Sequence, residues 1–195
     1  MSVIVCLFTA LSLLFGGGDV TAGIVVRQCE DWRYIVDRFT EEYDLDADLV
    51  LAVMAKESNC ENLKSSQDGL SVGLMQIVPR SWTMTKAYLE NPVWNIWQGM
   101  RFMSVIYSSE QNDGTWRTAL AAYNCGWTSL NDGKCHAGGG YAYADSILGY
   151  WFPLMRASRM GAVERLWFMW GRHGYTPYRF TQYAAQQQGR PQTGR

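Results

Sequence analysis

The sequence lacks the patterns that usually hold a metal ion or another cofactor. It has two histidines, His136 and His173, and neither has a partner at the spacing of a metal site. None of its five cysteines belongs to a Cys-x-x-Cys pair. The sequence also contains no nucleotide-binding motif and no recognised nucleic-acid-binding module. We therefore expect no metal, no other cofactor and no nucleic acid partner.

Charge is absent from the first fifteen residues, MSVIVCLFTALSLLF, and the small residues Val20-Thr21-Ala22 follow shortly after this apolar run. The pattern predicts a signal peptide over residues 1–22, cleaved after Ala22, and a chain exported to the periplasm or the exterior, in association with the cell wall. The run is short for a membrane span, which needs about 20 residues. The usual basic residues before the run are missing, so an uncleaved anchor stays open.

Four cysteines follow the predicted leader, an even number in an exported chain, which predicts two disulfides. Three pairings are open, and the sequence does not select among them. We favour Cys125 with Cys135, which would close a short glycine-containing loop, and Cys29 with Cys60. A zinc site is the competing interpretation, and the missing spacing argues against it.

The length of 195 residues fits one domain of ordinary size with extensions. Apolar residues recur at helical spacing from Cys29 onward, which predicts a packing helix, and again along most of residues 96–123 and 141–151. Residues 63–73 are rich in serine and glycine, and we expect them to form a turn or short hairpin. Residues 128–140 are interpreted as a glycine-rich loop.

The stretch 46–58 predicts a helix that carries one acidic residue on its apolar face. Asp46 is the expected N-cap, and Val50 and Met54 recur at helical spacing. Glu57 lies on the same face, three residues beyond Met54 and seven beyond Val50. Burial there favours the protonated carboxyl, which can donate a proton to a leaving oxygen. On pattern alone, a solvated residue on the flank of the helix is the simpler interpretation.

Three separated motifs bear on the role of Glu57. They are Glu57-Ser58, then Gly73-Leu74-Met75-Gln76-Ile77, then Ala122-Tyr123-Asn124-Cys125-Gly126. In order and approximate spacing they resemble the soluble lytic transglycosylase family, over about residues 45–151. The resemblance implies a mainly α, lysozyme-like helical domain over residues 23–151, with a small loop or hairpin region beside a substrate groove. It also implies peptidoglycan glycan strands as the substrate.

The same resemblance implies roles for individual residues. It places the catalytic acid on Glu57. The substrate-contacting residues that it implies are Ser58, Met75, Gln76, Tyr123, Asn124 and a loop serine that corresponds to Ser65 or Ser66, of which we take Ser66. The sequence departs from the family where many relatives have a Glu-Thr pair before the tyrosine that matches Tyr143, because residues 138–140 are all glycine here.

A single catalytic acid restricts the chemistry. Most glycosidases need two carboxylates, whereas only Glu57 falls on a catalytic position of the family. The N-acetyl group and the 6-hydroxyl of the substrate would then replace the second carboxylate and give a 1,6-anhydro product. Two alternatives stay open: a hydrolytic muramidase with Glu61 or Asp68 as the base, and a non-catalytic peptidoglycan-binding component of an envelope-spanning or phage machine.

The C-terminal residues differ in charge from the rest of the chain. Residues 152–195 hold seven arginines and one acid, Glu164, whereas residues 1–151 hold 10 basic and 17 acidic residues. The aromatic part, 152–183, is expected to pack on its own domain or to contact an anionic envelope polymer or membrane surface. Residues 184–195 have the composition of a disordered tail.

Overall fold

The computed structural model describes residues 20–63, 65, 69–79, 84–137 and 139–160. Within these residues the chain is helical, and strand-like pairing is confined to an isolated antiparallel bridge between Val72 and Ile77. The predicted mainly α class is confirmed. No helix in the described ranges is both long and apolar enough to cross a membrane. Most of the predicted leader, Ser66, Asp68 and the segment from residue 161 onward lie outside the described residues.

Two helices open the described part, where the sequence predicts one packing helix from Cys29 onward. α2 (Val20–Glu30) and α3 (Arg33–Tyr43) are separated by a turn. At this turn the indole N–H of Trp32 donates to the carbonyl of Cys60 at 3.0 Å. The Cys29–Cys60 disulfide is present, as favoured from the sequence, and joins the end of α2 to the segment that follows α4 (Ala47–Ser58).

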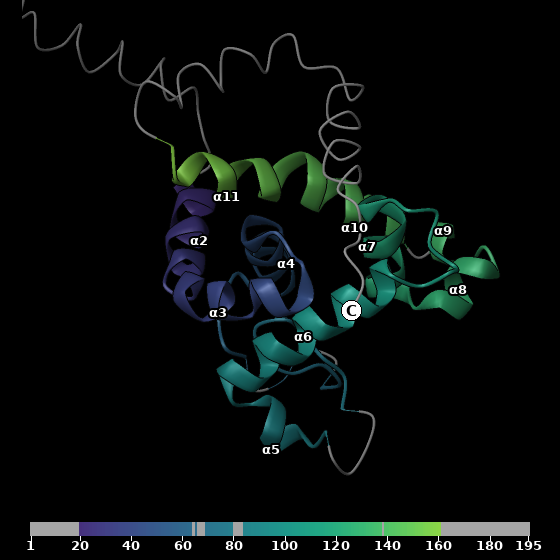
Figure 1. Cartoon of the computed structure of the whole chain (residues 1–195), viewed down its shortest axis with the longest axis horizontal. Helices are drawn as coiled ribbons and strands as arrows, with labels where there is room; N and C mark the ends of the chain where they lie inside the picture. Colours follow the sequence, from purple (N-terminus) through teal and green to yellow (C-terminus); the bar gives the residue numbers. More distant parts are fainter. Residues whose placement is uncertain (1–19, 64, 66–68, 80–83, 138, 161–195) are drawn as a thin grey trace, which may run out of the picture.

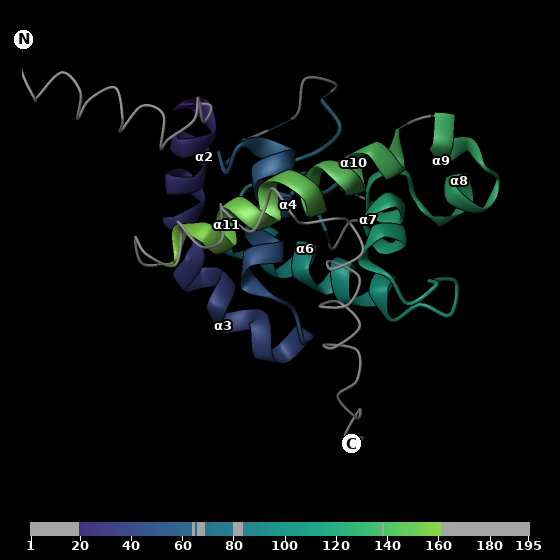
Figure 2. The same cartoon turned by 90° about the horizontal axis from the view of Figure 1, so that it is seen from above.

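The central helix of the fold is α4. Asp46 caps it as predicted, because its carboxylate accepts the backbone N–H of Asp48 at 2.8 Å. Every side chain from Leu49 to Ala55 is buried. Helices α2 and α3 cover one side of α4, and the last helices of the described part cross the other side (Figures 1 and 2). The sequence predicts a one-sided apolar stripe, and the structure buries this helix on nearly all sides.

A short helix and a long helix form the part of the fold below α4 in Figure 1. α5 (Lys86–Leu89) begins at Thr85, whose hydroxyl accepts the N–H of Tyr88, and α6 (Pro92–Tyr107) begins at Asn91, whose side chain accepts two backbone N–H groups. Proline suits the first turn of α6 because its missing N–H would have no helical partner there. α6 contacts α3 on one side and α7 (Trp116–Cys125) on the other, while α5 lies at the edge of the molecule (Figure 1).

The prediction of a glycine-rich loop over residues 128–140 is wrong for most of its length. α7 ends at Cys125 with Gly126 as its C-cap, and two short helices follow: α8 (Trp127–Asn131) and α9 (Lys134–Ala137). Gly133, at φ +72°, interrupts the helical path only between them. The Cys125–Cys135 disulfide, also favoured from the sequence, ties α9 back to the end of α7. Figure 2 shows α8 and α9 at one end of the molecule, beyond α7.

The predicted closing helix is longer than expected. α10 (Gly140–Ser146) continues through a π-helical turn, η1 (Ile147–Trp151), into α11 (Phe152–Ser158). Pro153 cannot donate the backbone hydrogen bond that an α-helix needs at its position, which accounts for the wider turn just before it. Met155 is buried in the main core. The packed helical part therefore continues past residue 151, where the sequence suggests a boundary.

A partly buried ionic cluster around Asp48 joins the first and last helices of the described part. The carboxylate of Asp48 is almost completely buried and lies 2.7 Å from Arg33, 3.5 Å from Arg156 and 3.6 Å from Arg159. Arg33 also pairs with Glu30, which accepts a hydrogen bond from Ser158 at 2.7 Å, and Arg156 pairs with Asp46. Two of the arginines counted in the basic C-terminal segment therefore bind the acidic side of their own domain.

Asp48→Asn should lower the free energy of unfolding by about 2 kcal/mol, because it removes the buried one of the two carboxylates that pair with the mostly buried Arg33. Urea denaturation at pH 7 with the disulfides intact would measure the change. Asp145→Asn is the matched control, since Asp145 also pairs with an arginine, Arg117, but both side chains are more than half exposed. That control should cost less than about 1 kcal/mol, and equal losses in the two variants would contradict a structural role for the cluster.

Candidate active site

Glu57 lies in the last turn of α4, where the neighbouring helices no longer bury this helix on all sides. The helix stops just beyond it because Asn59 and Cys60 adopt left-handed conformations, at φ +53° and +61°. Lys56 is exposed, whereas Glu57 is mostly buried. The chain thus places one carboxyl at the edge of its central buried helix, with access to the surface.

The environment of Glu57 favours a neutral carboxylic acid. Burial raises its pKa from 4.5 to about 7, and a hydrogen bond from the Tyr143 hydroxyl to Oε1 and the nearby charge of Lys56 only partly oppose this rise. The raised pKa agrees with the sequence-based expectation. In the described part of the chain Glu57 forms no ion pair, so no basic side chain holds it in the charged form.

A tight turn, Val72–Ile77, lies beside the end of α4. It contains the Gly-Leu-Met-Gln-Ile motif, and Gly73 and Gln76 adopt positive φ angles of +79° and +47°. The hydroxyl of Ser58 lies 2.8 Å from the carbonyl oxygen of Leu74, to which it can donate. The residue that follows Glu57 therefore connects α4 directly to this turn.

Asn95 of α6 holds the same turn from the other side. It is fully buried, its Oδ1 accepts the N–H of Met75 at 2.8 Å, and its Nδ2 donates to Val72 at 2.8 Å and to Leu89 at 3.0 Å. A Cβ at Gly73 would lie 2.2 Å from Nδ2 of Asn95. Only glycine permits this close approach, so Gly73 is required both for its φ angle and for its neighbour.

Two tyrosines from different helices complete the arrangement. Tyr143 of α10 donates to Glu57, and Tyr123 of α7 donates to the backbone carbonyl of Met75 at 2.9 Å. Burial and the nearby charge of Glu57 raise the pKa of both hydroxyls well above 10.0. Both tyrosines therefore remain protonated donors at neutral pH. The carboxyl of Glu57 is therefore contacted by Tyr143, whereas the hydroxyl of Tyr123 bonds to the Val72–Ile77 turn.

The Cys125–Cys135 disulfide packs against the start of the helix that carries Tyr143. A Cβ at Gly140 would lie 2.1 Å from Sγ of Cys135 and 3.3 Å from Sγ of Cys125. The bridge and Gly140 thus bring the end of α7 and the start of α10 into close contact, three residues before Tyr143.

The substrate-contacting residues implied by the sequence occupy different environments. Ser58 and Met75 are buried and make structural contacts. Gln76 is half-buried, and its amide donates to the carbonyl of Gly73 at 2.8 Å within its own turn. Asn124 is exposed beside Tyr123, and Ser66 lies outside the described residues. The structure therefore brings Glu57, Ser58, Met75 and Tyr123 into one connected group.

Sequence reasoning missed two residues of this group. Tyr143 had a usable signal, because the resemblance already matches it to a tyrosine of the family. Asn95 also had one, because it is a polar residue beside Ile96 in a helix whose buried positions are otherwise apolar or small. A polar side chain in such a place is usually one that holds buried backbone groups.

No metal site and no second carboxylate are found near Glu57 within the described ranges. These ranges contain no group of three or more His, Cys, Asp or Glu side chains that could hold a metal ion. Glu61 is exposed, and Asp68 lies outside the described residues. The pKa of Glu57 is shifted by burial, by the Tyr143 hydrogen bond and by the charge of Lys56, and not by another described acid.

Gly73→Ala should destabilise the protein by about 3 kcal/mol. The positive φ angle costs an alanine about 1 kcal/mol, and displacing Asn95 costs about 2 kcal/mol more. Gly114→Ala isolates the first contribution, because Gly114 also has φ +79° but no atom within 4 Å of an added Cβ. Urea denaturation of both variants measures the difference, and similar losses would exclude a close approach of Asn95.

Comparison with known proteins agrees with this arrangement. The family model described as "Transglycosylase SLT domain" matches residues 35–140, more than half of the chain. A search of curated proteins gave no match. The match includes α4 with Glu57, the Val72–Ile77 turn, Asn95 and Tyr123. The chain therefore belongs to the transglycosylase SLT domain family, which acts on peptidoglycan.

Proposed function

We propose that this protein is a lytic transglycosylase that cleaves the MurNAc-GlcNAc bond of peptidoglycan and leaves 1,6-anhydro-MurNAc ends. The observation that carries the proposal is the mostly buried carboxyl of Glu57, whose pKa is about 7 and which has no described second carboxylate beside it. A single carboxyl with this pKa can act first as an acid and then as a base near neutral pH.

In the first step, protonated Glu57 donates its proton to the glycosidic oxygen, and the bond from that oxygen to the anomeric carbon of MurNAc breaks. The carbonyl oxygen of the MurNAc N-acetyl group bonds to the anomeric carbon and stabilises the positive charge that develops there. Tyr143 holds the carboxyl in place during this step, because its hydroxyl donates to Oε1 and leaves the other oxygen to carry the proton.

In the second step, Glu57 is a carboxylate and accepts the proton of the MurNAc 6-hydroxyl. The 6-oxygen bonds to the anomeric carbon, the bond from the N-acetyl oxygen breaks, and the 1,6-anhydro ring closes. Glu57 ends the cycle protonated, so the chain needs neither a water nucleophile nor a second acid. This is the chemical advantage of one carboxyl with a pKa close to the working pH.

Gln76 and Asn124 are the proposed substrate contacts. The Gln76 side chain donates one amide hydrogen to its own turn, and its carbonyl oxygen suits an N-acetyl or hydroxyl group of the glycan. Asn124 is exposed and offers a second amide. Ser58 and Met75 act through position rather than by direct contact, since both are buried. Ser66 remains a proposed contact from the sequence.

We also propose that the chain is exported through its N-terminal apolar segment and acts at the cell wall. Membership of the family implies action on peptidoglycan outside the cytoplasm. The two disulfides suit an oxidising compartment. Contact of residues 161–183 with an anionic envelope surface is the corresponding proposal for the rest of the basic segment.

Glu57→Gln should lower the release of soluble muropeptides by at least about a thousandfold, because glutamine has no acidic proton to donate and cannot act as the base. Mass spectrometry of products from purified peptidoglycan gives both the rate and the chemistry, and wild-type protein should give anhydro-muropeptides. Glu61→Gln is the matched control: Glu61 is the exposed neighbouring acid, and its loss should leave the rate within about twofold of wild type.

The products separate the alternatives. Reducing-end products from wild-type protein would make it a hydrolytic muramidase, and a loss of activity in Glu61→Gln would name the base. If folded wild-type protein sediments with peptidoglycan but releases no muropeptides, a non-catalytic binding role replaces the proposed reaction.

The pH dependence of kcat/KM reports the protonation of Glu57. The free enzyme must carry the proton, so kcat/KM should fall about tenfold per pH unit above about pH 7. The Tyr143 hydrogen bond lowers the pKa of Glu57, so Tyr143→Phe should move this decline to higher pH. Tyr123→Phe removes a hydroxyl that bonds to Met75 instead. In that variant the decline in kcat/KM should begin at the same pH as in the wild type, even if kcat/KM itself is lower. A decline unmoved by Tyr143→Phe would assign the titration to another group.

A further inference from the structure

Four aromatic rings from three helices meet on the surface outside the catalytic group. They are Tyr43 of α3, Tyr88 of α5, and Trp94 and Trp97 of α6, which we call the aromatic surface. Tyr88 and Trp94 stack, with ring centroids 5.7 Å apart and planes at 19°. Trp97 meets the edges of Trp94 and Tyr43, each at 6.3 Å. The rings therefore form one continuous row.

The two tryptophans are not explained by the core of the fold. Trp94 is 46% exposed, and neither tryptophan is among the described residues that pack against the hydrophobic core, whereas Tyr43 and Tyr88 are. Both tryptophans lie away from the face of α6 that carries Ile96. Large rings left partly exposed and clustered in this way are typical of a binding surface.

A cation accompanies the rings. The guanidinium of Arg101 lies 5.7 Å from the ring centroid of Trp97 and is exposed. Arg101 forms no ion pair within the described part of the chain. An exposed guanidinium beside aromatic faces can pair with a carboxylate of a ligand that lies on the rings.

The aromatic surface is connected to the segment that leaves the catalytic helix. Asn62, five residues after Glu57, donates to the carbonyl of Glu90 at 3.0 Å, between Tyr88 and Trp94 in the sequence. Five residues span at most about 18 Å. Asn95, next to Trp94, holds the turn beside Glu57. A polymer bound at the catalytic carboxyl is therefore within reach of the aromatic surface.

We propose that the aromatic surface is a second binding site for the peptidoglycan strand, outside the catalytic group. This inference rests on the proposed function for its substrate. The C–H faces of sugar rings pack on the tryptophan and tyrosine faces, and Arg101 pairs with a carboxylate of a stem peptide. A row of four rings fits a narrow strand, whereas a protein partner usually covers about 800 Å² on each side.

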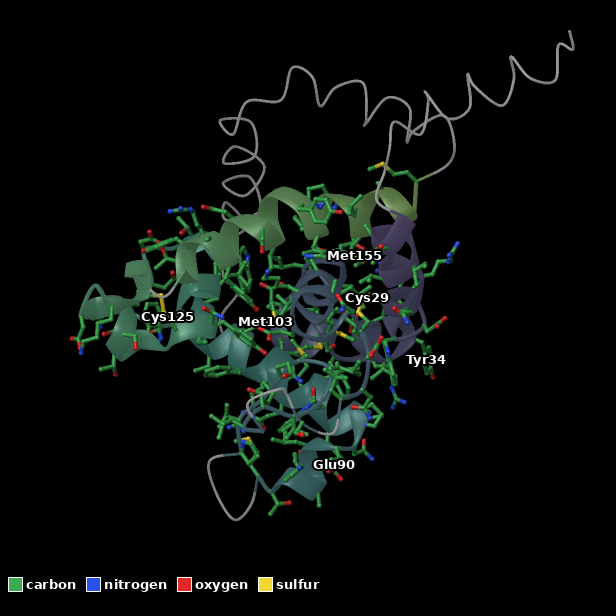
Figure 3. The ribbon with its side chains drawn as sticks, turned by 180° about the vertical axis from the view of Figure 1, so that it is seen from behind. Cys29, Tyr34, Glu90, Met103, Cys125 and Met155 are labelled. Carbon is green, nitrogen blue, oxygen red and sulfur yellow. A yellow bond between two sulfur atoms is a disulfide. The ribbon has the colours of Figure 1, made fainter. Side chains whose placement is uncertain are left out.

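Co-sedimentation of the full chain with purified insoluble peptidoglycan tests this proposal, in the Glu57→Gln background so that the strand is not cut. Adding Trp94→Ala should weaken binding about tenfold or more, and Arg101→Glu should also weaken it. Tyr34→Ala is the matched control, because Tyr34 is a 73% exposed aromatic residue of α3 that is not part of the row of rings and lies apart from Glu90 (Figure 3). That control should bind like its parent.

Unchanged binding in both the Trp94→Ala and the Arg101→Glu variants, with native melting temperatures, would overturn the proposal. The proposal would also be overturned if these variants lost binding to phosphatidylglycerol vesicles but kept their binding to peptidoglycan. The aromatic surface would then be a membrane contact. If Glu57 proves not to be the catalytic acid, any remaining cleavage affects Trp94→Ala and its Tyr34→Ala control in the same background, so the difference in binding between them stays informative. Loss of peptidoglycan binding in Trp94→Ala, with binding retained in Tyr34→Ala, supports the second site.

Discussion

The burial of α4 on nearly all sides is the constraint on which the rest of this structure depends. An apolar run from Leu49 to Ala55 must be covered, and the surrounding helices provide that cover (Figures 1 and 2). Because the cover ends at the last turn, Glu57 is desolvated without being sealed from the surface. The same packing that stabilises the fold therefore raises the pKa of the one carboxyl that the proposed reaction uses.

The geometry beside Glu57 is held mainly through backbone groups. Asn95, Ser58 and Tyr123 all bond to the main chain of the Val72–Ile77 turn, from α6, α4 and α7. The turn is thus fixed from three directions before any substrate binds, and little conformational entropy is left to lose there. Tyr143 adds a fourth helix through its bond to Glu57. A site built from four helices in this way is rigid because each helix is itself part of the core.

The sequence predicts the helices well because they depend on local pattern. Capping of α4 by Asp46 follows from neighbouring residues, whereas the raised pKa of Glu57 depends on burial by helices that are distant in the sequence. Contacts between distant segments are harder to predict. The periodicity of α4 does not reveal that every side is covered, and no local signal pairs Tyr143 rather than Tyr123 with Glu57, since 86 residues separate the two partners. The continuation of the last helix to Ser158 was missed for a different reason: the boundary at residue 151 came from the extent of the family resemblance and from the change in charge, and neither reports on packing.

The buried carboxyl also has a consequence for folding. In the unfolded chain Glu57 titrates near its ordinary pKa of 4.5, whereas in the folded protein it titrates near 7. Between these two values the folded state binds the extra proton, so the free energy of unfolding contributed by this residue falls as pH rises. Above about pH 7 the charged carboxylate must be held in a desolvated place, at a cost on the order of 3 kcal/mol. The protein therefore gives up thermodynamic stability at neutral pH in order to keep a proton available.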